Sequence, residues 1–159
     1  MGVSGSGKTT IGRLLAQRTG WPFLDADGLH PPANVAKMRG GIPLTDSDRR
    51  PWLEAVAAWV ADRRAAGQPA IVGCSALKRA YRELLRQAAP DLRVVYLQGD
   101  RELLERRLVR RQGHFFPAHL LDAQLDDLEE PAPDEHPITV PIGGSEADTV
   151  DAIVKRLAG

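Results

Sequence analysis

The sequence predicts an α/β protein in which helices cover both faces of a mostly parallel β-sheet. The first observation is that short apolar segments alternate with longer amphipathic segments along the 159 residues. The second is that two short segments, 70–75 and 93–98, are largely apolar, which is typical of buried parallel strands. The third is a glycine-rich segment at 2–9 that matches G-x-x-x-x-G-K-[ST], a loop that normally joins a strand to a helix.

The first half of the chain contains three predicted helices and one predicted strand. One helix runs from the glycine-rich loop to a stop at Gly20. "PFLDAD" predicts a short strand that ends in acidic residues, and "PPANVAKMRGG" predicts a short helix. A long helix follows Thr45, which forms a capping-box pattern with Asp48. Trp52 and Trp59 lie on the apolar stripe of that helix, so we interpret both as core residues.

Strands and helices alternate through the second half of the chain. "AIVGCS" and "RVVYLQ" predict strands, with a helix through "KRAYRELLRQAA" between them. Asp100 caps a helix through "DRELLERRLVRRQG", and "AHLLDAQLDDLEE" predicts another helix. "ITVPI" and "EADTVDAIVKRLA" predict the last strand and the last helix. We expect one domain, 1–159, in which the insert at about 28–66 and the region at about 106–130 form flaps on the core.

The composition narrows the classes of function. The 21 basic and 21 acidic residues cancel, so no excess charge favours nucleic acid or a membrane surface as a partner. Cys74 is the only cysteine, which excludes an internal disulfide and fits a reducing compartment. No apolar run approaches the roughly 18 residues of a membrane-spanning helix, and no leader pattern is present. We therefore expect a soluble, cytoplasmic protein.

The glycine-rich segment has the residues of a nucleotide phosphate site. Its three glycines let backbone N–H groups point into a concave nest, and the helix that follows directs its N-terminal dipole there. Lys8 supplies a positive charge for the β and γ phosphates, and the Thr9 hydroxyl is the expected Mg²⁺ ligand. The alternative is a Gly/Ser-rich tail in front of a helix. The expected nucleotide-binding residues are Gly2, Val3, Ser4, Gly5, Ser6, Gly7, Lys8, Thr9 and Thr10.

Two acidic residues lie at the predicted carboxyl end of a strand, where phosphoryl transfer enzymes use carboxylates. The strand "AIVGCS" does not end in an aspartate, whereas Asp25 and Asp27 follow the earlier strand. Carboxyl ends of parallel strands converge on the ligand crevice, and residues i and i+2 of a strand point the same way. One carboxylate can hold metal-bound water while the other accepts the proton of an attacking hydroxyl. A simple Asp-Ala-Asp-Gly turn remains the alternative.

Five longer segments complete the pattern in a fixed order. They are "DADGLHP", "KMRGGIPLTDSDRRPWL", "CSALKRAYRELLR", "YLQGD" and "RRQGHFFPAHLLDAQLDDLEEP". Together they resemble gluconokinase of the small P-loop type, a family similar in fold to shikimate kinase and the nucleoside monophosphate kinases. The resemblance implies a three-layer P-loop kinase fold with a helical acceptor-binding insert and an Arg-rich lid. It also implies ATP- and Mg²⁺-dependent phosphorylation of D-gluconate to 6-phosphogluconate, and it makes a homodimer an expectation.

The matched motifs imply roles for individual residues. Asp27 would be the general base and Asp25 the partner of the metal, while His30 would bind a sugar hydroxyl or orient Asp27. Arg107 and Arg111 lie four residues apart, so they share a helix face that can close over the triphosphate. We expect an arginine of the lid and the loop at 142–145 to contact the adenine. The acceptor would be bound by Asp27, His30, Arg49, Lys78, Arg82, His114 and Gln124.

Three alternatives to this function remain at this point. The chain could be another small-molecule kinase, such as a shikimate kinase, or a nucleotide-binding switch without an acceptor. It could also be inactive, because the phosphate loop begins directly after Met1. In the related family an apolar strand precedes this loop and lies centrally in the sheet. We therefore expect the first strand to be missing from the chain and the natural protein to begin several residues upstream.

Overall fold

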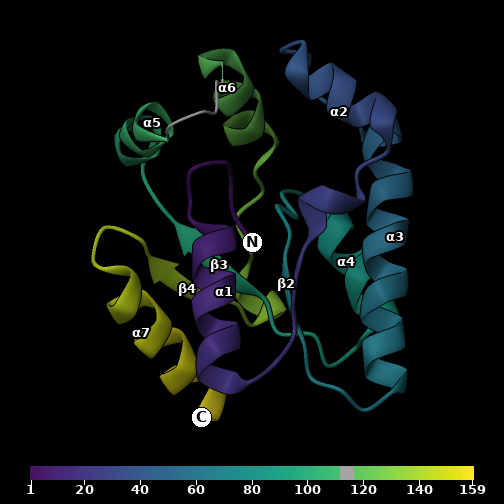
Figure 1. The fold of residues 1–159 in the computed structure, drawn as a ribbon, viewed down its shortest axis with the longest axis vertical. Coiled ribbons are helices and arrows are strands. Elements are labelled where there is room, and N and C mark those ends of the chain that lie inside the picture. The colour runs from purple at the N-terminus through teal and green to yellow at the C-terminus, as the bar shows by residue number, and fades with distance from the viewer. Residues whose placement is uncertain (112–116) are drawn as a thin grey trace.

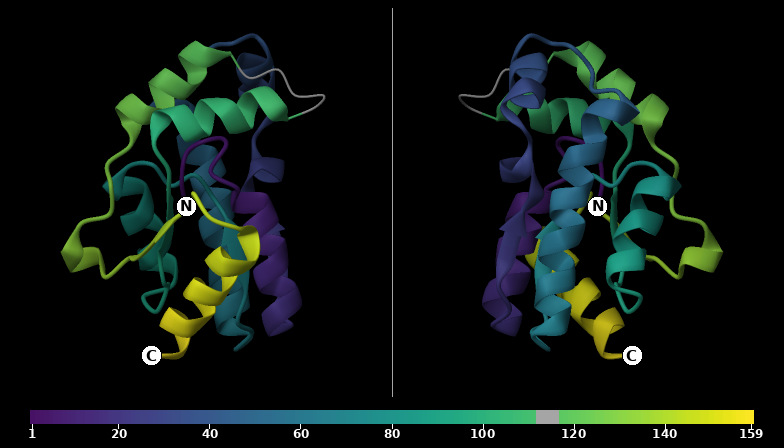
Figure 2. Two further views of the ribbon diagram at one scale, coloured as in Figure 1. Left: turned by 90° about the vertical axis from the view of Figure 1, so that its left-hand side faces the viewer. Right: turned by 90° about the vertical axis from the view of Figure 1, so that its right-hand side faces the viewer.

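Parallel strands form the middle layer, with α1 and α7 on one side and α3 and α4 on the other (Figures 1 and 2). The computed structural model describes residues 1–111 and 117–159. The arrangement confirms the predicted α/β fold. In chain order, the elements are α1 (Lys8–Thr19), β1 (Phe23–Asp25), the 3₁₀ turn η1 (Ala26–Leu29), α2 (Pro32–Arg39), α3 (Asp46–Ala65), β2 (Ile71–Gly73), α4 (Arg79–Ala88), β3 (Val95–Gln98), α5 (Arg101–Arg110), α6 (Ala118–Asp127), η2 (Pro133–Glu135), β4 (Ile138–Pro141) and α7 (Glu146–Ala158).

Local signals set the ends of the helices. Gly20 adopts φ 74° and ends α1, because this left-handed conformation is costly for any residue with a Cβ. Thr45 and Asp48 form both hydrogen bonds of the capping box at the start of α3. The Asp100 side chain accepts a hydrogen bond from the N–H of Leu103 at 2.8 Å and so caps α5. These three caps lie where the sequence predicts them.

The strands form two parallel pairs with a gap between them. In the first pair Leu24 of β1 lies opposite Val72 of β2. In the second, Tyr96 of β3 lies opposite Thr139 of β4. The facing edges of β2 and β3 are not hydrogen-bonded to each other in the described part of the chain. The described strands therefore form two separate parallel pairs.

Two clusters of buried side chains make up the core. One lies around α1 and α7 and includes Leu15, Val140 and Ile153. The other lies around α3 and α4 and includes Trp52, which is only 1% exposed and therefore a core residue as predicted. Trp59 is half-buried, with the guanidinium of Arg63 over its ring at 5.7 Å. The sheet and its two apolar clusters thus hold the loops at the carboxyl ends of the strands.

The thiol of Cys74 is buried, and desolvation raises its pKa to about 11. A thiol in that state behaves as a small apolar group rather than a nucleophile. None of the helices in the described ranges combines the length and the apolar character needed to cross a membrane.

Candidate active site

The glycine-rich segment forms a loop in front of α1, as its motif predicts. Gly5 and Gly7 adopt φ values of 85° and 89°, in the left-handed region that favours glycine. A Cβ at Gly5 would also lie 3.1 Å from the carbonyl oxygen of Leu104. Gly7 is the N-cap of α1, whose described neighbours provide no side-chain cap. The first-turn N–H groups of α1 therefore remain available to an anion such as a phosphate.

Lys8 is the cation of this loop. Its Nζ donates a hydrogen bond to the carbonyl oxygen of Val3 at 3.1 Å. Burial lowers the pKa of Lys8, while the nearby charges of Asp27 and Asp25 raise it. Both acidic residues predicted for the site thus lie within electrostatic reach of the Lys8 ammonium.

Thr9 and Asp25 contact each other directly. The Thr9 hydroxyl donates to Oδ2 of Asp25 at 2.7 Å. Mg²⁺ is usually held by one or two protein oxygens together with phosphate oxygens and water, and a hydroxyl beside a carboxylate fits that donor set. No cluster of three or more acidic, His or Cys ligands occurs among the described residues, so a metal bound by protein ligands alone is not indicated. The pair therefore suits a nucleotide-bound Mg²⁺.

Asp25 also fixes the backbone that carries Asp27. Its Oδ1 accepts a hydrogen bond from the N–H of Asp27 at 3.1 Å and caps η1. The two aspartates therefore do not act as an i, i+2 pair of one strand, because Asp25 ends β1 and Asp27 lies in the 3₁₀ turn. Asp27 is exposed, whereas Asp25 is half-buried. The turn that the sequence offers as an alternative is present, and it carries Asp27 to the site.

Trp52 and Asn34 pack against the 3₁₀ turn η1 and the residue that follows it, His30. The indole Nε1 of Trp52 donates to the carbonyl oxygen of Ala26 at 2.7 Å. The His30 ring stacks on the indole, with centroids 4.2 Å apart and planes 16° from parallel. The amide nitrogen of buried Asn34 lies 3.3 Å from Nδ1 of His30 and donates to the carbonyl oxygen of Asp48 at 2.8 Å. Burial lowers the pKa of His30, which favours its neutral ring at pH 7.

A cluster of charged residues joins α3, α4 and α6. Nη1 of Arg49 lies 2.9 Å from Oδ2 of Asp127 and donates to the Tyr81 hydroxyl at 3.0 Å. Nζ of Lys78 lies 3.0 Å from Oδ1 of Asp46 and 3.9 Å from Oδ1 of Asp127. The Tyr81 hydroxyl donates to Asp46, and this bond and Lys78 lower the pKa of that carboxyl. Arg49 and Lys78 are thus brought together around one carboxylate, that of Asp127.

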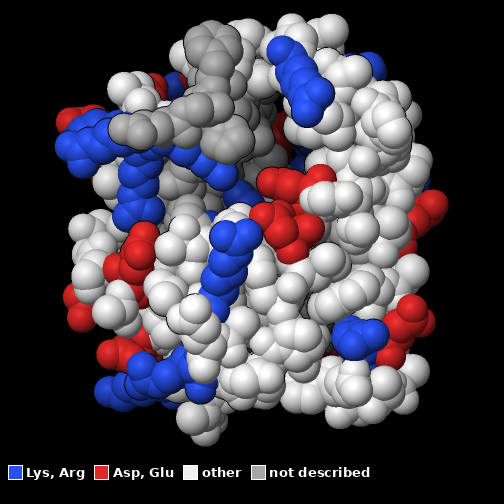
Figure 3. Space-filling view, viewed as in Figure 1, with Lys and Arg blue, Asp and Glu red and all other residues white. Residues whose placement is uncertain are grey.

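Arg107 of α5 and Arg111, which directly follows this helix, lie near the phosphate loop. Nη2 of Arg107 donates to the carbonyl oxygen of Ile142 at 2.6 Å, and its Nη1 lies 3.5 Å from the Cβ position of Gly7. Arg111 is close enough to Lys8 to lower its pKa. Acidic and basic side chains gather around a hollow in the upper half of this face (Figure 3). The arginines predicted for the lid therefore lie near the phosphate loop.

Helix α6 reaches the same loop through Gln124. Its Oε1 accepts a hydrogen bond from the N–H of Ser4 at 2.7 Å. Arg101 of α5 binds Asp122 of α6, which ties the two helices together. His114, predicted to face the acceptor, lies outside the described residues. Gln124 thus lies at the site, in contact with the phosphate loop.

Arg82 does not join this group. Its side chain is 1% exposed, with Nε and Nη2 bound to Glu135 at 2.7 and 2.8 Å. Its Nη1 donates to the carbonyl oxygens of Ala76 and Leu77 at 3.0 and 3.2 Å. Arg82 also does not share a helix face with Lys78, because Lys78 has an extended backbone and is the N-cap of α4. In this structure Arg82 is buried, supports the loop before Lys78 and uses four of its five N–H donors within the described part of the chain.

Tyr81, Asp46 and Asp127 were not predicted from the sequence. Tyr81 follows Lys78 by three residues, and the ammonium lies 5.9 Å from the centroid of its ring. The spacing of Lys78 and Tyr81 was visible in the sequence. The contact between Lys78 and Asp127 was not, because 49 residues separate them and no local pattern links the loop before α4 to the end of α6.

The first 131 residues match the model of the AAA domain family. The chain is 51% identical over 140 residues to a gluconokinase of Gluconobacter oxydans, and the match covers 88% of this chain and 79% of that protein. It is 43% identical over 162 residues to the thermoresistant gluconokinase of Escherichia coli, covering 98% of this chain and 91% of that protein.

Solved structures resemble this chain over almost its whole length. A crystal structure of a gluconokinase from Sinorhizobium meliloti superposes with a TM-score of 0.91 at 45% identity, covering 99% of this chain and 89% of that chain. A shikimate kinase from Acinetobacter baumannii, solved with shikimate, gives a TM-score of 0.61 at 23% identity, over 99% of this chain and 89% of that chain. The second likeness shows the fold alone.

Proposed function

The chain belongs to the gluconokinase family of P-loop phosphotransferases, and from this premise we propose that it transfers the γ-phosphoryl group of ATP to a hydroxyl of D-gluconate, giving 6-phosphogluconate. The observation that carries the proposal is the meeting of three groups at one end of the sheet. These are the phosphate loop, the acidic turn at Asp25 and Asp27, and the cationic pair Arg49 and Lys78.

ATP binds along the phosphate loop. The glycine backbone and the N-terminus of α1 bind the phosphates, and Lys8 places its charge at the β and γ groups. Arg107 and Arg111 neutralise the charge that develops on the transferred phosphoryl group. Arg107 and the loop at 142–145 contact the adenine, and the hydrogen bond from Arg107 to the carbonyl oxygen of Ile142 at 2.6 Å supports this assignment by placing the two together.

Thr9 and Asp25 would hold Mg²⁺, the Thr9 hydroxyl as a ligand and Asp25 through a water molecule. When bound, the ion would supply positive charge that stabilises the reacting phosphoryl group. The contact between the two side chains at 2.7 Å supports this assignment. Asp25 meanwhile keeps the N–H of Asp27 in place, so both tasks of the acidic turn depend on it.

Asp27 accepts the proton of the attacking hydroxyl. The hydroxyl oxygen forms a bond to the γ-phosphorus as the bond from phosphorus to the β-phosphate oxygen breaks, and the proton passes to the carboxylate. Its exposure and its closeness to Lys8 support this role. His30, held on Trp52, orients Asp27 or binds a sugar hydroxyl.

Arg49 and Lys78 bind the carboxylate of gluconate. The two cations already converge on the Asp127 carboxylate, and this convergence supports an anion site between them. Gln124 and His114 supply hydrogen bonds to the polyol. In this arrangement the insert at about 28–66 holds the acceptor, and the region at about 106–130 closes over both substrates and excludes water.

A coupled assay of ADP release tests the proposal with gluconate, shikimate and nucleoside monophosphates as separate acceptors. We expect turnover with gluconate alone. Turnover with shikimate or a nucleotide in its place would assign another acceptor, and ADP release that is independent of any acceptor would identify a nucleotide-hydrolysing switch. Lys8→Ala serves as the matched inactive control, because it removes the cation of the phosphate loop.

A further inference from the structure

The loop between β2 and α4 carries Lys78 to the acceptor site and contains a strained residue. Ala76 has φ 44°, in the left-handed region that is costly for a residue with a Cβ. It is 4% exposed and packs in the buried cluster that includes Trp52. Lys78, two residues further on, is the extended N-cap of α4. A strained backbone of this kind persists only where the surrounding structure holds it in place.

Arg82 binds three consecutive carbonyl oxygens of this loop. Its Nη1 donates to those of Ala76 and Leu77 at 3.0 and 3.2 Å. Its backbone N–H donates to that of Lys78 at 3.3 Å, as the first turn of α4 begins. A guanidinium presents its donors in a rigid fork, so its position sets the positions of both carbonyls that share Nη1. Arg82 therefore fixes the backbone from the strained residue up to Lys78.

Glu135 holds the guanidinium of Arg82 in place. Both side chains are only 1% exposed, and the two oxygens of Glu135 accept from Nε and Nη2 of Arg82 at 2.7 and 2.8 Å. These bonds lower the pKa of the Glu135 carboxyl, so it is ionised at pH 7. A buried ion pair adds little net stability, because the desolvation of both charges offsets their attraction. The orientation that the pair gives to Arg82 is therefore the better explanation for it.

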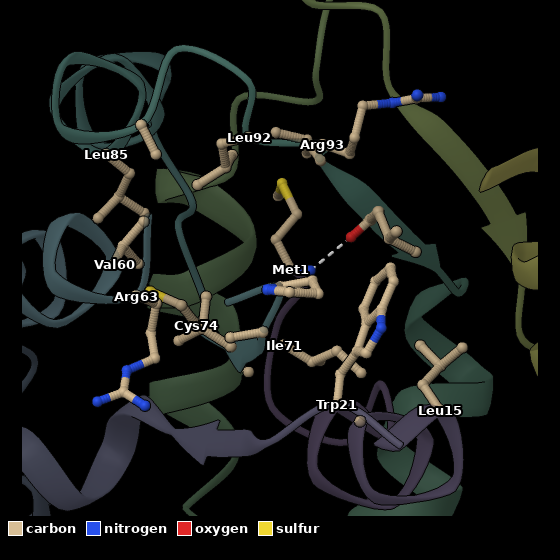
Figure 4. Close-up of a pocket in the computed structure, with 18 of the residues that line it drawn as sticks. Met1, Leu15, Trp21, Val60, Arg63, Ile71, Cys74, Leu85, Leu92 and Arg93 are labelled. Carbon is tan, nitrogen blue, oxygen red and sulfur yellow. Dashed lines mark hydrogen bonds between the residues drawn. The ribbon is translucent and has the colours of Figure 1, made fainter. Parts of the chain in front are cut away.

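The protein interior and the chain after α6 enclose the loop from two sides. Leu85, three residues after Arg82 on α4, lines an apolar pocket together with Cys74, which precedes the loop (Figure 4). The face of α4 that carries Arg82 therefore points inward. From the other side, the N–H of Glu129 donates to the carbonyl oxygen of Leu77 at 2.8 Å. The Leu77 carbonyl thus accepts from both Arg82 and the segment that follows α6.

We propose that Arg82, oriented by Glu135, is a positioning residue for the acceptor: it holds the strained loop so that Lys78 reaches the carboxylate of gluconate. Nη1 of Arg49 and Nζ of Lys78 lie 2.9 and 3.9 Å from the two oxygens of Asp127. The placement of Lys78 therefore decides how the two cations share one anion. Arg82 itself is buried and acts through Lys78. The inference rests on the proposed function, because it takes Lys78 as a ligand of gluconate.

Arg82→Lys tests the inference, because lysine keeps a cation beside Glu135 but lacks the fork that reaches the loop carbonyls. Arg86→Lys is the matched control. Nη1 of Arg86 lies 3.6 Å from the same carboxylate, and within residues 1–111 and 117–159 its side chain donates to Glu135 and not to the loop at 76–78. We expect Arg82→Lys to raise the KM for gluconate about ten-fold or more, with the KM for ATP and kcat within about two-fold of the parent chain. Arg86→Lys should leave all three near the parent values.

Ala76→Gly separates positioning from stability. Glycine adopts a φ of 44° without strain, so the loop needs less support from Arg82. Ala76→Gly combined with Arg82→Lys should therefore recover a large part of the lost affinity for gluconate. If Arg82→Lys lowers the thermal midpoint without changing the KM for gluconate, or raises both KM values alike, the inference is wrong. It is also wrong if Ala76→Gly gives no recovery.

Hydrogen exchange gives a readout that does not depend on the acceptor. The amide of Glu129, which donates to the Leu77 carbonyl, should exchange faster in Arg82→Lys than in Arg86→Lys. A parent chain that does not phosphorylate gluconate would overturn the proposed function, and the inference with it. A parent chain that does phosphorylate gluconate, with equal exchange at Glu129 in the two variants, would overturn the inference alone.

Discussion

The side-chain oxygen of Gln124 accepts a hydrogen bond from the backbone N–H of Ser4 at 2.7 Å, so α6 occupies a donor of the phosphate loop. A nucleotide phosphate needs the N–H groups of that loop. The contact therefore competes with ATP in the structure as it stands, and it links the region expected to close over the acceptor with the loop that binds the nucleotide.

Replacing Gln124 by alanine should tighten ATP binding when no acceptor is present. The net value of such a hydrogen bond is about 0.5–1.5 kcal/mol, so we expect the Kd of ATP to fall about two- to ten-fold. Gln124→Glu keeps an acceptor for the Ser4 N–H and should not show the gain. Calorimetric titration with a non-hydrolysable ATP analogue measures both variants; weaker binding by Gln124→Ala would contradict the prediction.

Asp25→Asn should raise the Mg²⁺ requirement. Asparagine can still accept the hydrogen bond from the N–H of Asp27 through its Oδ1, and its Nδ2 can donate to the Thr9 hydroxyl oxygen, so the turn keeps its shape while the charge is lost. Loss of a partner that orients metal-bound groups costs about 10- to 100-fold in metal affinity. Activity measured across a Mg²⁺ titration should show that shift with little change in the KM for gluconate. An unaltered Mg²⁺ dependence would remove Asp25 from the metal site.

Asp27→Asn should lower kcat by about 10²- to 10⁴-fold, the usual contribution of a general base. Since Asp27 is exposed, the change should leave the thermal midpoint near that of the parent chain. The KM values for both substrates should change little, because the loss lies in the chemical step. Retention of most of the turnover would assign the base to another residue.

Arg49→Met should raise the KM for gluconate much more than the KM for ATP. Arg49 holds Asp127 at 2.9 Å, and the gluconate carboxylate would have to take that place. Asp127→Asn should accordingly lower the KM for gluconate, because a competing anion is lost. Arg50→Met is the control, since Arg50 is exposed and its one ion pair among residues 1–111 and 117–159 is with Glu54 at 2.7 Å. A larger effect on ATP than on gluconate would move Arg49 to the nucleotide side.

Features of the fold that depend on neighbouring residues were predictable from the sequence. The cap at Thr45, the stop at Gly20 and the phosphate loop each depend on a few consecutive residues, and each lies where it was expected. Strand lengths were overestimated: β2 spans Ile71–Gly73 rather than 70–75, because its second edge has few partners in the described chain. Local patterns cannot report which edges of a strand are paired.

The candidate site was predictable to the extent that its residues belong to strand ends and motifs. Thr9 and Asp25 were expected to share a metal, and they are in contact. Arg82 was assigned to the acceptor, but a sequence pattern cannot reveal that this side chain turns into the interior. Its orientation is decided by Glu135, which lies 53 residues further along the chain and provides a carboxylate 1% exposed. Choices of that kind depend on tertiary partners.

Blocking the amine of Met1 should remove a pH dependence of stability. The pKa of this group is lowered from 8.0 to about 5 in the folded chain, chiefly by desolvation and then by Lys8. Between those values the unfolded chain binds a proton that the folded chain does not, so the free energy of unfolding rises with pH from about 5 to 8. A shift of this size corresponds to about 4 kcal/mol across the whole window.

Urea unfolding of the free and the N-acetylated chain at pH 5.5 and pH 8 measures the difference. Acetylation leaves an amide N–H to donate to Val95 and removes the charge. The free energy of unfolding of the acetylated chain should therefore depend much less on pH, and it should exceed that of the free chain most at pH 5.5. His30, whose pKa is also lowered by burial, contributes in the same direction, and a His30→Gln background separates the two groups. Equal slopes for the free and acetylated chains in that background would show that the amine is solvated. The nitrogen of Met1 would then not be buried beside the Val95 carbonyl.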